Sequence, residues 1–146
     1  MKNMNLLSGL IAAFAVPLVA SSAQAYGGDK YIDDAQTRLK PGVYQGKVGR
    51  GQNCTVRVNL QKNGKERRYS VEITPTLTSY ATDNGPTMIS FSSRDARVLN
   101  NDNGAHAVSN SGDDYLVLGI TPVKGGTFIR AYVKRGPSLK TAECTI

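Results

Sequence analysis

The sequence contains no tryptophan, only one histidine and only two cysteines. A single histidine excludes a metal site built from several imidazoles. The cysteines, Cys54 and Cys144, lack the Cys-x-x-Cys spacing of redox and zinc motifs. Their wide separation and the missing tryptophan also disfavour an immunoglobulin-type disulfide. Internal repeats and low-complexity segments are absent as well, which argues against a repeat architecture.

The chain also lacks the common catalytic and phosphate-binding motifs. It has no Gly-x-Ser-x-Gly elbow, and the closely spaced glycines of 46–51 neither belong to a βαβ unit nor open a helix. Its one histidine, His106, lies beside Asn103-Gly104, where a solvated loop residue is the simpler interpretation. We therefore expect no catalytic residue. A hydrolase of envelope polymers, with His106 as its base, ranks third among the functions considered.

Acidic residues occur in two adjacent pairs and in one polar loop. The pairs Asp33-Asp34 and Asp113-Asp114 would point to opposite faces in a strand, and in turns aspartate commonly caps the backbone. The loop 93–114 supplies oxygen ligands for calcium but lacks the alternating acidic spacing and distal glutamate of an EF-hand. We expect no cofactor and no metal, and calorimetry with calcium is the test for this loop.

The first 25 residues have the features of a cleaved secretory signal peptide. A basic Lys2 precedes an apolar run over 6–20, which is shorter than the roughly 20 residues of a membrane-spanning helix. The segment ends in Ala-Gln-Ala, with small residues at the positions that signal peptidase reads. We predict export to the periplasm or the extracellular space, with no transmembrane segment in the mature chain.

The mature chain would start at Tyr26 and would be basic, because losing Lys2 takes the formal charge from +7 to +6 (7 − 1). Such a balance favours anionic partners and surfaces. The cations are spread along the chain and do not form a run, so nucleic acid is not specifically indicated.

The stretch 54–73 carries the clearest β-hairpin pattern, because alternating apolar residues flank Asn63-Gly64, a dipeptide that favours a two-residue type I′ turn. A turn there places Arg57 diagonal to Glu72 on the outer face. It also predicts that apolar residues meet on the inner face: Val58 with Tyr69, Val56 with Val71 and Cys54 with Ile73.

A second hairpin is predicted over 115–134, with Gly125-Gly126 at its centre. Its apolar residues again share one face, while Tyr132 falls opposite Gly119 on the other. The predicted inner pairs are Ile120 with Ala131 and Leu118 with Val133, and Leu116 meets Arg135 at the open end.

Shorter strands are predicted over 43–48, 87–92 and 142–146, and a weak hairpin is expected around Asn103-Gly104. We interpret residues 26–41 as a flexible or partly helical leader, because three apolar residues there have near-helical spacing. Residues 42–146 would form one all-β domain.

Two cysteines in an exported chain most economically form one disulfide. A Cys54–Cys144 bond would close a loop of about 90 residues, worth about 4 to 5 kcal/mol in the chain-entropy model. Both cysteines fall on apolar strand faces, so the bond would tie the last strand to an early one. We predict a single small antiparallel β-barrel or a two-sheet β-sandwich of about seven to nine strands.

The outward-facing positions of the two hairpins combine cations with aromatic side chains, which suit carboxylates, phosphates and sugar-rich polymers. Solvation of an exposed sheet face explains the same pattern. The candidate binding surface consists of Arg57, Arg68, Phe128, Arg130, Tyr132 and Lys134.

These observations favour a non-catalytic exported binding module that engages an anionic polymer or envelope component, or a protein partner. Inhibition of a secreted enzyme would be one form of this function, because rigid loops bind at a low entropic cost. The second hypothesis is a carrier of a small apolar ligand inside a β-barrel.

Overall fold

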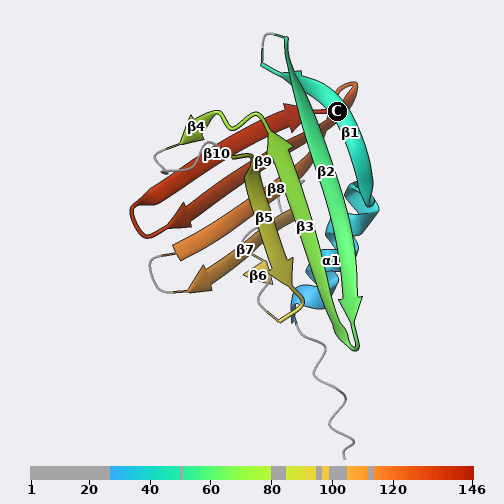
Figure 1. Ribbon diagram of the computed structural model, residues 1–146. Coiled ribbons are helices and arrows are strands. Elements are labelled where there is room, and N and C mark those ends of the chain that lie inside the picture. Colours follow the sequence, from blue (N-terminus) through green and yellow to red (C-terminus); the bar gives the residue numbers. More distant parts are fainter. Residues whose placement is uncertain (1–26, 50, 80–84, 95–96, 99–104, 112–113) are drawn as a thin grey trace, which may run out of the picture.

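The computed structural model describes residues 27–49, 51–79, 85–94, 97–98, 105–111 and 114–146 (Figure 1). The predicted signal peptide and the turn at Asn103-Gly104 lie outside this part of the chain. Within it, no helix has the length and apolar character needed to cross a membrane.

One helix precedes ten antiparallel strands in the described residues, which confirms the all-β class. Eight strands have six residues or more, and two have only two residues. The elements are α1 (Gly27–Arg38), β1 (Gly42–Val48), β2 (Gln52–Asn63), β3 (Glu66–Thr74), β4 (Thr78–Ser79), β5 (Thr87–Ser92), β6 (Arg97–Val98), β7 (Ala105–Ser111), β8 (Asp114–Val123), β9 (Gly126–Arg135) and β10 (Ser138–Thr145).

The sheet is folded into two layers and is not closed into a barrel. Its strand order is β5-β3-β2-β1-β10-β9-β8-β7-β6, and β4 pairs with β10. Strands β1 and β10 are joined by one register pair, Lys47 with Thr145. We call β5-β3-β2-β1 the first half-sheet and β10-β9-β8-β7-β6 the second half-sheet. In Figure 1 the strands β3 and β5 cross over β8 and β9 at a large angle, so the inner faces of the half-sheets meet.

The core lies between the half-sheets and is made by alternating residues of the strands, as a period of two requires. Almost all of these side chains are at most 2% exposed. They come from β2, β3 and β5 on one side (Cys54, Val56, Val58, Tyr69, Val71, Ile73, Ile89, Phe91) and from β8, β9 and β10 on the other (Leu118, Ile120, Ile129, Ala131, Ala142, Cys144).

The leader forms a helix that packs against this core, and the apolar residues predicted at helical spacing face inward with Tyr31. Arg67 on β3 holds the helix by an ion pair with Asp29 at 3.0 Å and another with Asp33 at 2.6 Å. The buried hydroxyl of Tyr69 donates a hydrogen bond of 2.7 Å to the carbonyl of Leu39, just after the helix. The residues interpreted as a flexible or partly helical leader therefore form a helix that contacts β3, β6, β7 and β8.

The register predicted for the first hairpin is wrong by two residues. Gly64 and Lys65 form the loop, and Gly64 adopts a φ of 60°. The observed cross-strand pairs are Asn63 with Glu66, Leu60 with Tyr69, Val58 with Val71, Arg57 with Glu72 and Val56 with Ile73. A shift of two residues leaves every side chain on its predicted face, because faces alternate with a period of two. The observed register places Arg57 directly opposite Glu72, whereas the predicted turn would have left the two residues diagonal to each other.

The second hairpin is also displaced by two residues, in the opposite direction. Its loop is Lys124-Gly125, and Gly126 begins β9. A Cβ atom on Gly126 would overlap the carbonyl oxygen of Ile146, so this glycine serves a close approach of the C-terminal strand. The observed pairs are Ile120 with Ile129, Leu118 with Ala131, Val117 with Tyr132, Leu116 with Val133 and Gly119 with Arg130. The predicted contact of Tyr132 with Gly119 is therefore wrong.

The predicted disulfide is present, with Cys54 of β2 bonded to Cys144 of β10. It passes across β1, which lies between these strands at residue Gly46. A Cβ atom on Gly46 would overlap the backbone of Thr145 and lie 2.9 Å from the sulfur of Cys144. The disulfide therefore links the two half-sheets covalently beside the β1–β10 junction, where one register pair connects them.

The remaining predicted strands are all present, and one of them is longer than predicted. Strand β1 matches the predicted 43–48 within one residue, β5 has the predicted bounds, and β6 pairs with β7 as the weak hairpin required. The last strand starts at Ser138, four residues before the predicted start.

Candidate binding surface on the second half-sheet

The six predicted surface residues lie on two different faces of the molecule. Arg57 and Arg68 project from β2 and β3 of the first half-sheet, and the other four project from β9 of the second. The inner residues of both half-sheets share one core, so their outer residues point away from each other. The structure therefore divides the predicted surface into two separate candidates.

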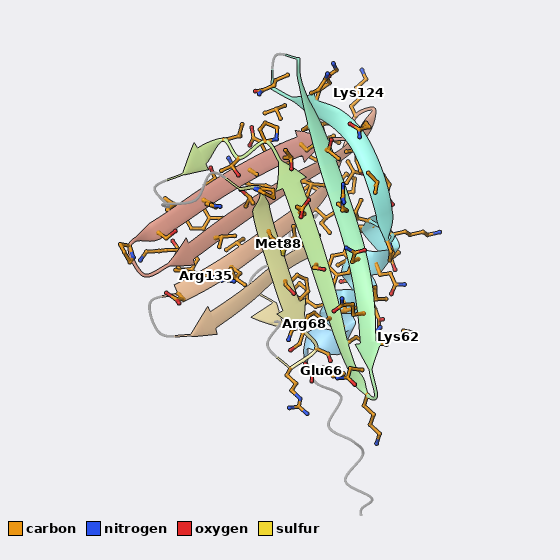
Figure 2. The ribbon with its side chains drawn as sticks, viewed as in Figure 1. Lys62, Glu66, Arg68, Met88, Lys124 and Arg135 are labelled. Carbon is orange, nitrogen blue, oxygen red and sulfur yellow. A yellow bond between two sulfur atoms is a disulfide. The ribbon has the colours of Figure 1, made fainter. Side chains whose placement is uncertain are left out.

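On the outer face of the first half-sheet, both arginines lie near carboxylates. Arg57 is 4.0 Å from Glu72, and Arg68 is 3.8 Å from Glu66 and 3.4 Å from the hydroxyl of Ser90. Figure 2 shows Arg68 and Met88 on the neighbouring strands β3 and β5, and Met88 is 52% exposed. These exposed, partly neutralised cations match a solvated sheet face.

A groove of about 650 Å³ lies on the outer face of the second half-sheet. Three consecutive strands, β8, β9 and β10, form its floor, and two register rows cross it. One row contains Val117, Tyr132 and Thr141, and the next contains Gly119, Arg130 and Glu143. Leu77 forms part of the wall, because its amide donates a 2.8 Å hydrogen bond to the carbonyl of Thr141 and so holds the start of β4 against β10.

Two tyrosines form the aromatic part of the groove. The rings of Tyr115 and Tyr132 are stacked, with centroids 5.1 Å apart and an interplanar angle of 17°. Their hydroxyl groups share a hydrogen bond of 3.0 Å, which raises the pKa of Tyr132. The ammonium of Lys134 lies 5.8 Å from the Tyr115 ring centroid, within the range of a cation–π interaction.

A charged pair lies beside the tyrosines. Arg130 is 3.6 Å from Glu143 on the adjacent strand, and the Arg130 side chain is 68% exposed while that of Glu143 is 27% exposed. Gly119, which is buried, faces Arg130 on the other neighbouring strand, and the exposure of Arg130 leaves its guanidinium accessible to solvent. The groove therefore offers a cation and a carboxylate next to an aromatic surface.

Of the predicted residues, Arg130 and Tyr132 line the groove and Lys134 borders it through Tyr115. Phe128 projects from the same face near the hairpin loop, where it pairs with Thr121 and Thr145, and it is not part of the lining. Arg57 and Arg68 belong to the opposite face.

Sequence reasoning missed Tyr115, Thr141 and Leu77. Tyr115 has the outward parity of β8, and pairing β8 with β9 brings it beside Tyr132, so alternation together with the correct register would have found it. Leu77 gave no such signal, because its position depends on the long-range pairing of β4 with β10.

The other sites considered in the sequence gain no support. Asp33 is bound by Arg67, and Asp114 accepts a 2.6 Å hydrogen bond from the amide of Gly136. The described residues contain no group of three or more histidine, cysteine, aspartate or glutamate side chains placed to hold a metal ion. The side chain of His106 and much of the loop 93–114 lie outside the described part.

Models of known protein families, curated proteins and solved structures were all searched, and none of them matches this chain. Function must therefore be argued from the site itself.

Proposed function

We propose that the protein is an exported, non-catalytic binding module that engages an anionic envelope component through the outer face of its second half-sheet. The observation that carries the proposal is the groove, which Arg130 and the stacked tyrosines line and which Lys134 borders through Tyr115. Charge-assisted hydrogen bonds from such cations hold carboxylate or phosphate groups, while aromatic rings add contact area at a low entropic cost.

Two further features support a surface site in an exported protein. A disulfide is kept in oxidising compartments, which agrees with the signal peptide predicted over residues 1–25. The space between the described half-sheets is filled by large buried side chains such as Tyr69 and Phe91. This filling favours binding on the outside over an apolar ligand carried within.

The test compares two charge-reversal variants of the mature protein on a carboxymethyl column. Arg130→Glu with Lys134→Glu alters the groove, and Arg57→Glu with Arg68→Glu alters the opposite face. Each double variant changes the formal charge by −4 (two reversals of −2), so the loss of non-specific attraction is matched.

We expect the groove variant to elute at a clearly lower salt concentration than its matched control, because only the groove variant removes specific contacts. Equal elution of both variants would contradict the proposal, since retention would then follow net charge alone. Unfolding curves of both variants establish that each is folded.

A further inference from the structure

The groove contains a carboxylate where a site for a polyphosphate would need only cations. Glu143 is partly buried on the floor, 3.6 Å from Arg130, and shares a register row with it. A dense row of phosphates would be repelled by this carboxylate. A ligand with separated negative charges and many hydroxyl groups would use it as a hydrogen-bond acceptor.

The other polar groups of the groove are also suited to hydroxyl groups. The Tyr115 and Tyr132 hydroxyls share one hydrogen bond, so the pair keeps one proton to donate and lone pairs to accept. The hydroxyl of Thr141, in the same register row as Tyr132, is a further donor and acceptor. A sugar ring presents hydroxyl groups of this dual kind around its edge.

The apolar groups of the groove suit the remaining surface of a sugar. Tyr132, Val117 and Leu77 contribute apolar area to the lining. The C–H groups on one face of a pyranose ring carry small positive charges, which the negative face of an aromatic ring attracts. Arg130 and Lys134 are four residues apart on β9, about 13 Å along the strand. This span is longer than one sugar ring, so a chain of sugars would meet both cations.

We infer that the groove binds an acidic glycan, with a sugar carboxylate paired to Arg130 and neighbouring sugar hydroxyls donating to Glu143. This inference rests on the proposed function and narrows it to one class of anionic polymer. Lys134 pairs with a second carboxylate further along the glycan. Tyr132 packs against a sugar ring that lies between the two carboxylates.

The experiment measures binding of the mature protein by calorimetry to three probes: a short oligomer of galacturonic acid, the same oligomer as its methyl ester, and inorganic polyphosphate. We expect the acid oligomer to bind at least about tenfold more tightly than either of the others, because it alone combines carboxylates with hydroxyl groups. Polyphosphate binding as tightly as the acid oligomer would overturn the inference.

The decisive variant is Glu143→Gln, which keeps the side-chain size but removes the charged acceptor. It should weaken binding of the acid oligomer about tenfold and strengthen binding of polyphosphate, because a repulsive charge is removed. Tighter binding of both probes, or no change in either, would overturn the inference. The matched control is Glu72→Gln on the opposite face, where the carboxylate pairs with Arg57 at 4.0 Å and is similarly exposed. It should leave both affinities unchanged.

The two proposals fail in different ways. Equal effects of charge reversal on the two faces contradict the anionic binding site itself. If binding requires Arg130 and Lys134 but polyphosphate binds more tightly than the acid oligomer, the anionic binding site stands and the assignment of an acidic glycan is wrong.

Discussion

The two outer faces of the molecule carry the same kinds of charge in different settings. Each has an arginine opposite a glutamate on the adjacent strand: Arg57 with Glu72 on the first half-sheet and Arg130 with Glu143 on the second. Only the second of these pairs lies in the groove of about 650 Å³, beside two stacked tyrosines. Both faces carry alternating cations, so the proposed site rests on the aromatic pair and the hollow around it, which only the second face has.

The hollow itself depends on a segment from the first half-sheet. After β3 the chain crosses to β10, where the amide of Leu77 bonds to Thr141 and β4 adds a short edge. The wall of the groove is therefore formed by the segment that connects β3 of the first half-sheet to the edge of β10 in the second. The groove keeps its shape only if the two half-sheets keep their relative positions.

The largest expected effect comes from breaking the connection between the half-sheets. Replacing Cys54 and Cys144 with alanine should lower the free energy of unfolding by about 4 kcal/mol, because the bond spans a sequence separation of 90 residues. Urea denaturation measures the change, with the chemically reduced wild-type protein as control. A loss below about 1 kcal/mol would mean that core packing alone holds the half-sheets together.

The next largest effect is a difference in stability loss between removing the buried hydroxyl of the first half-sheet and removing a hydroxyl of the tyrosine pair on the second. Tyr69→Phe should cost about 2 kcal/mol, because the carbonyl of Leu39 loses its buried hydrogen-bond donor. Tyr132→Phe, on the half-exposed outer face, should change stability by less than about 0.5 kcal/mol. Equal losses in the two variants would contradict this contrast.

The buried Tyr69 also makes the stability depend on pH in the alkaline range. Burial, with a smaller contribution from Tyr44, raises the pKa of Tyr69 far above its ordinary value of 10.0. The folded state therefore keeps this proton while the unfolded state releases it, so stability is present below pH 10.0 and falls as the pH rises further. Tyr69→Phe should lack this part of the alkaline loss in denaturation curves recorded on both sides of pH 10.0.

A neutral substitution tests the aromatic part of the comparison without altering charge. Tyr132→Ala should weaken binding of the galacturonic acid oligomer by up to about tenfold, because ring stacking is lost while Arg130 and Lys134 remain. Met88→Ala removes an exposed apolar side chain from the opposite face and should leave the affinity unchanged. Calorimetry compares the two, and similar losses would show that the tyrosine pair is not part of the site.

The smallest effect concerns the ion pairs. Arg67→Gln should reduce stability by about 1 kcal/mol, because the Arg67 side chain is only 22% exposed and the carboxylates of Asp33 and Asp29, which it pairs with on α1, raise its pKa. Arg57→Gln should change it by less than about 0.5 kcal/mol, since the Arg57 side chain is 58% exposed and 4.0 Å from Glu72. A larger loss for Arg57→Gln would indicate that the first outer face is more than a solvated surface.

Alternation of apolar residues predicted which face of each hairpin is buried, and it did so correctly for both. Turn preference was the weaker guide, because Asn63-Gly64 and Gly125-Gly126 each contribute only one residue to the observed loop. A favoured turn dipeptide does not outweigh packing, and Gly126 is required beside Ile146 for a reason that is not local in sequence. Both register errors were shifts of two residues, so every side chain stayed on its predicted face.

The helix and the groove show the limits of single-sequence reasoning in different ways. Apolar spacing indicated the inner face of α1, but the contacts that hold this segment come from Arg67 and Tyr69, which lie 38 and 30 residues beyond their partners Asp29 and Leu39. The outward cations were predicted as one surface because alternation gives no information on which layer each strand joins. Only the strand order separates Arg57 from Arg130.

The central claim is that an anionic ligand binds on the outer face of β8, β9 and β10 and not on the outer face of β2 and β3. Titration of isotopically labelled mature protein with the galacturonic acid oligomer, followed by amide chemical shifts, tests it directly. We predict saturable shifts at Tyr115, Arg130, Tyr132 and Thr141, with Arg57 and Arg68 unaffected. Shifts of equal size on both faces, or a set confined to Arg57 and Arg68, would contradict the claim.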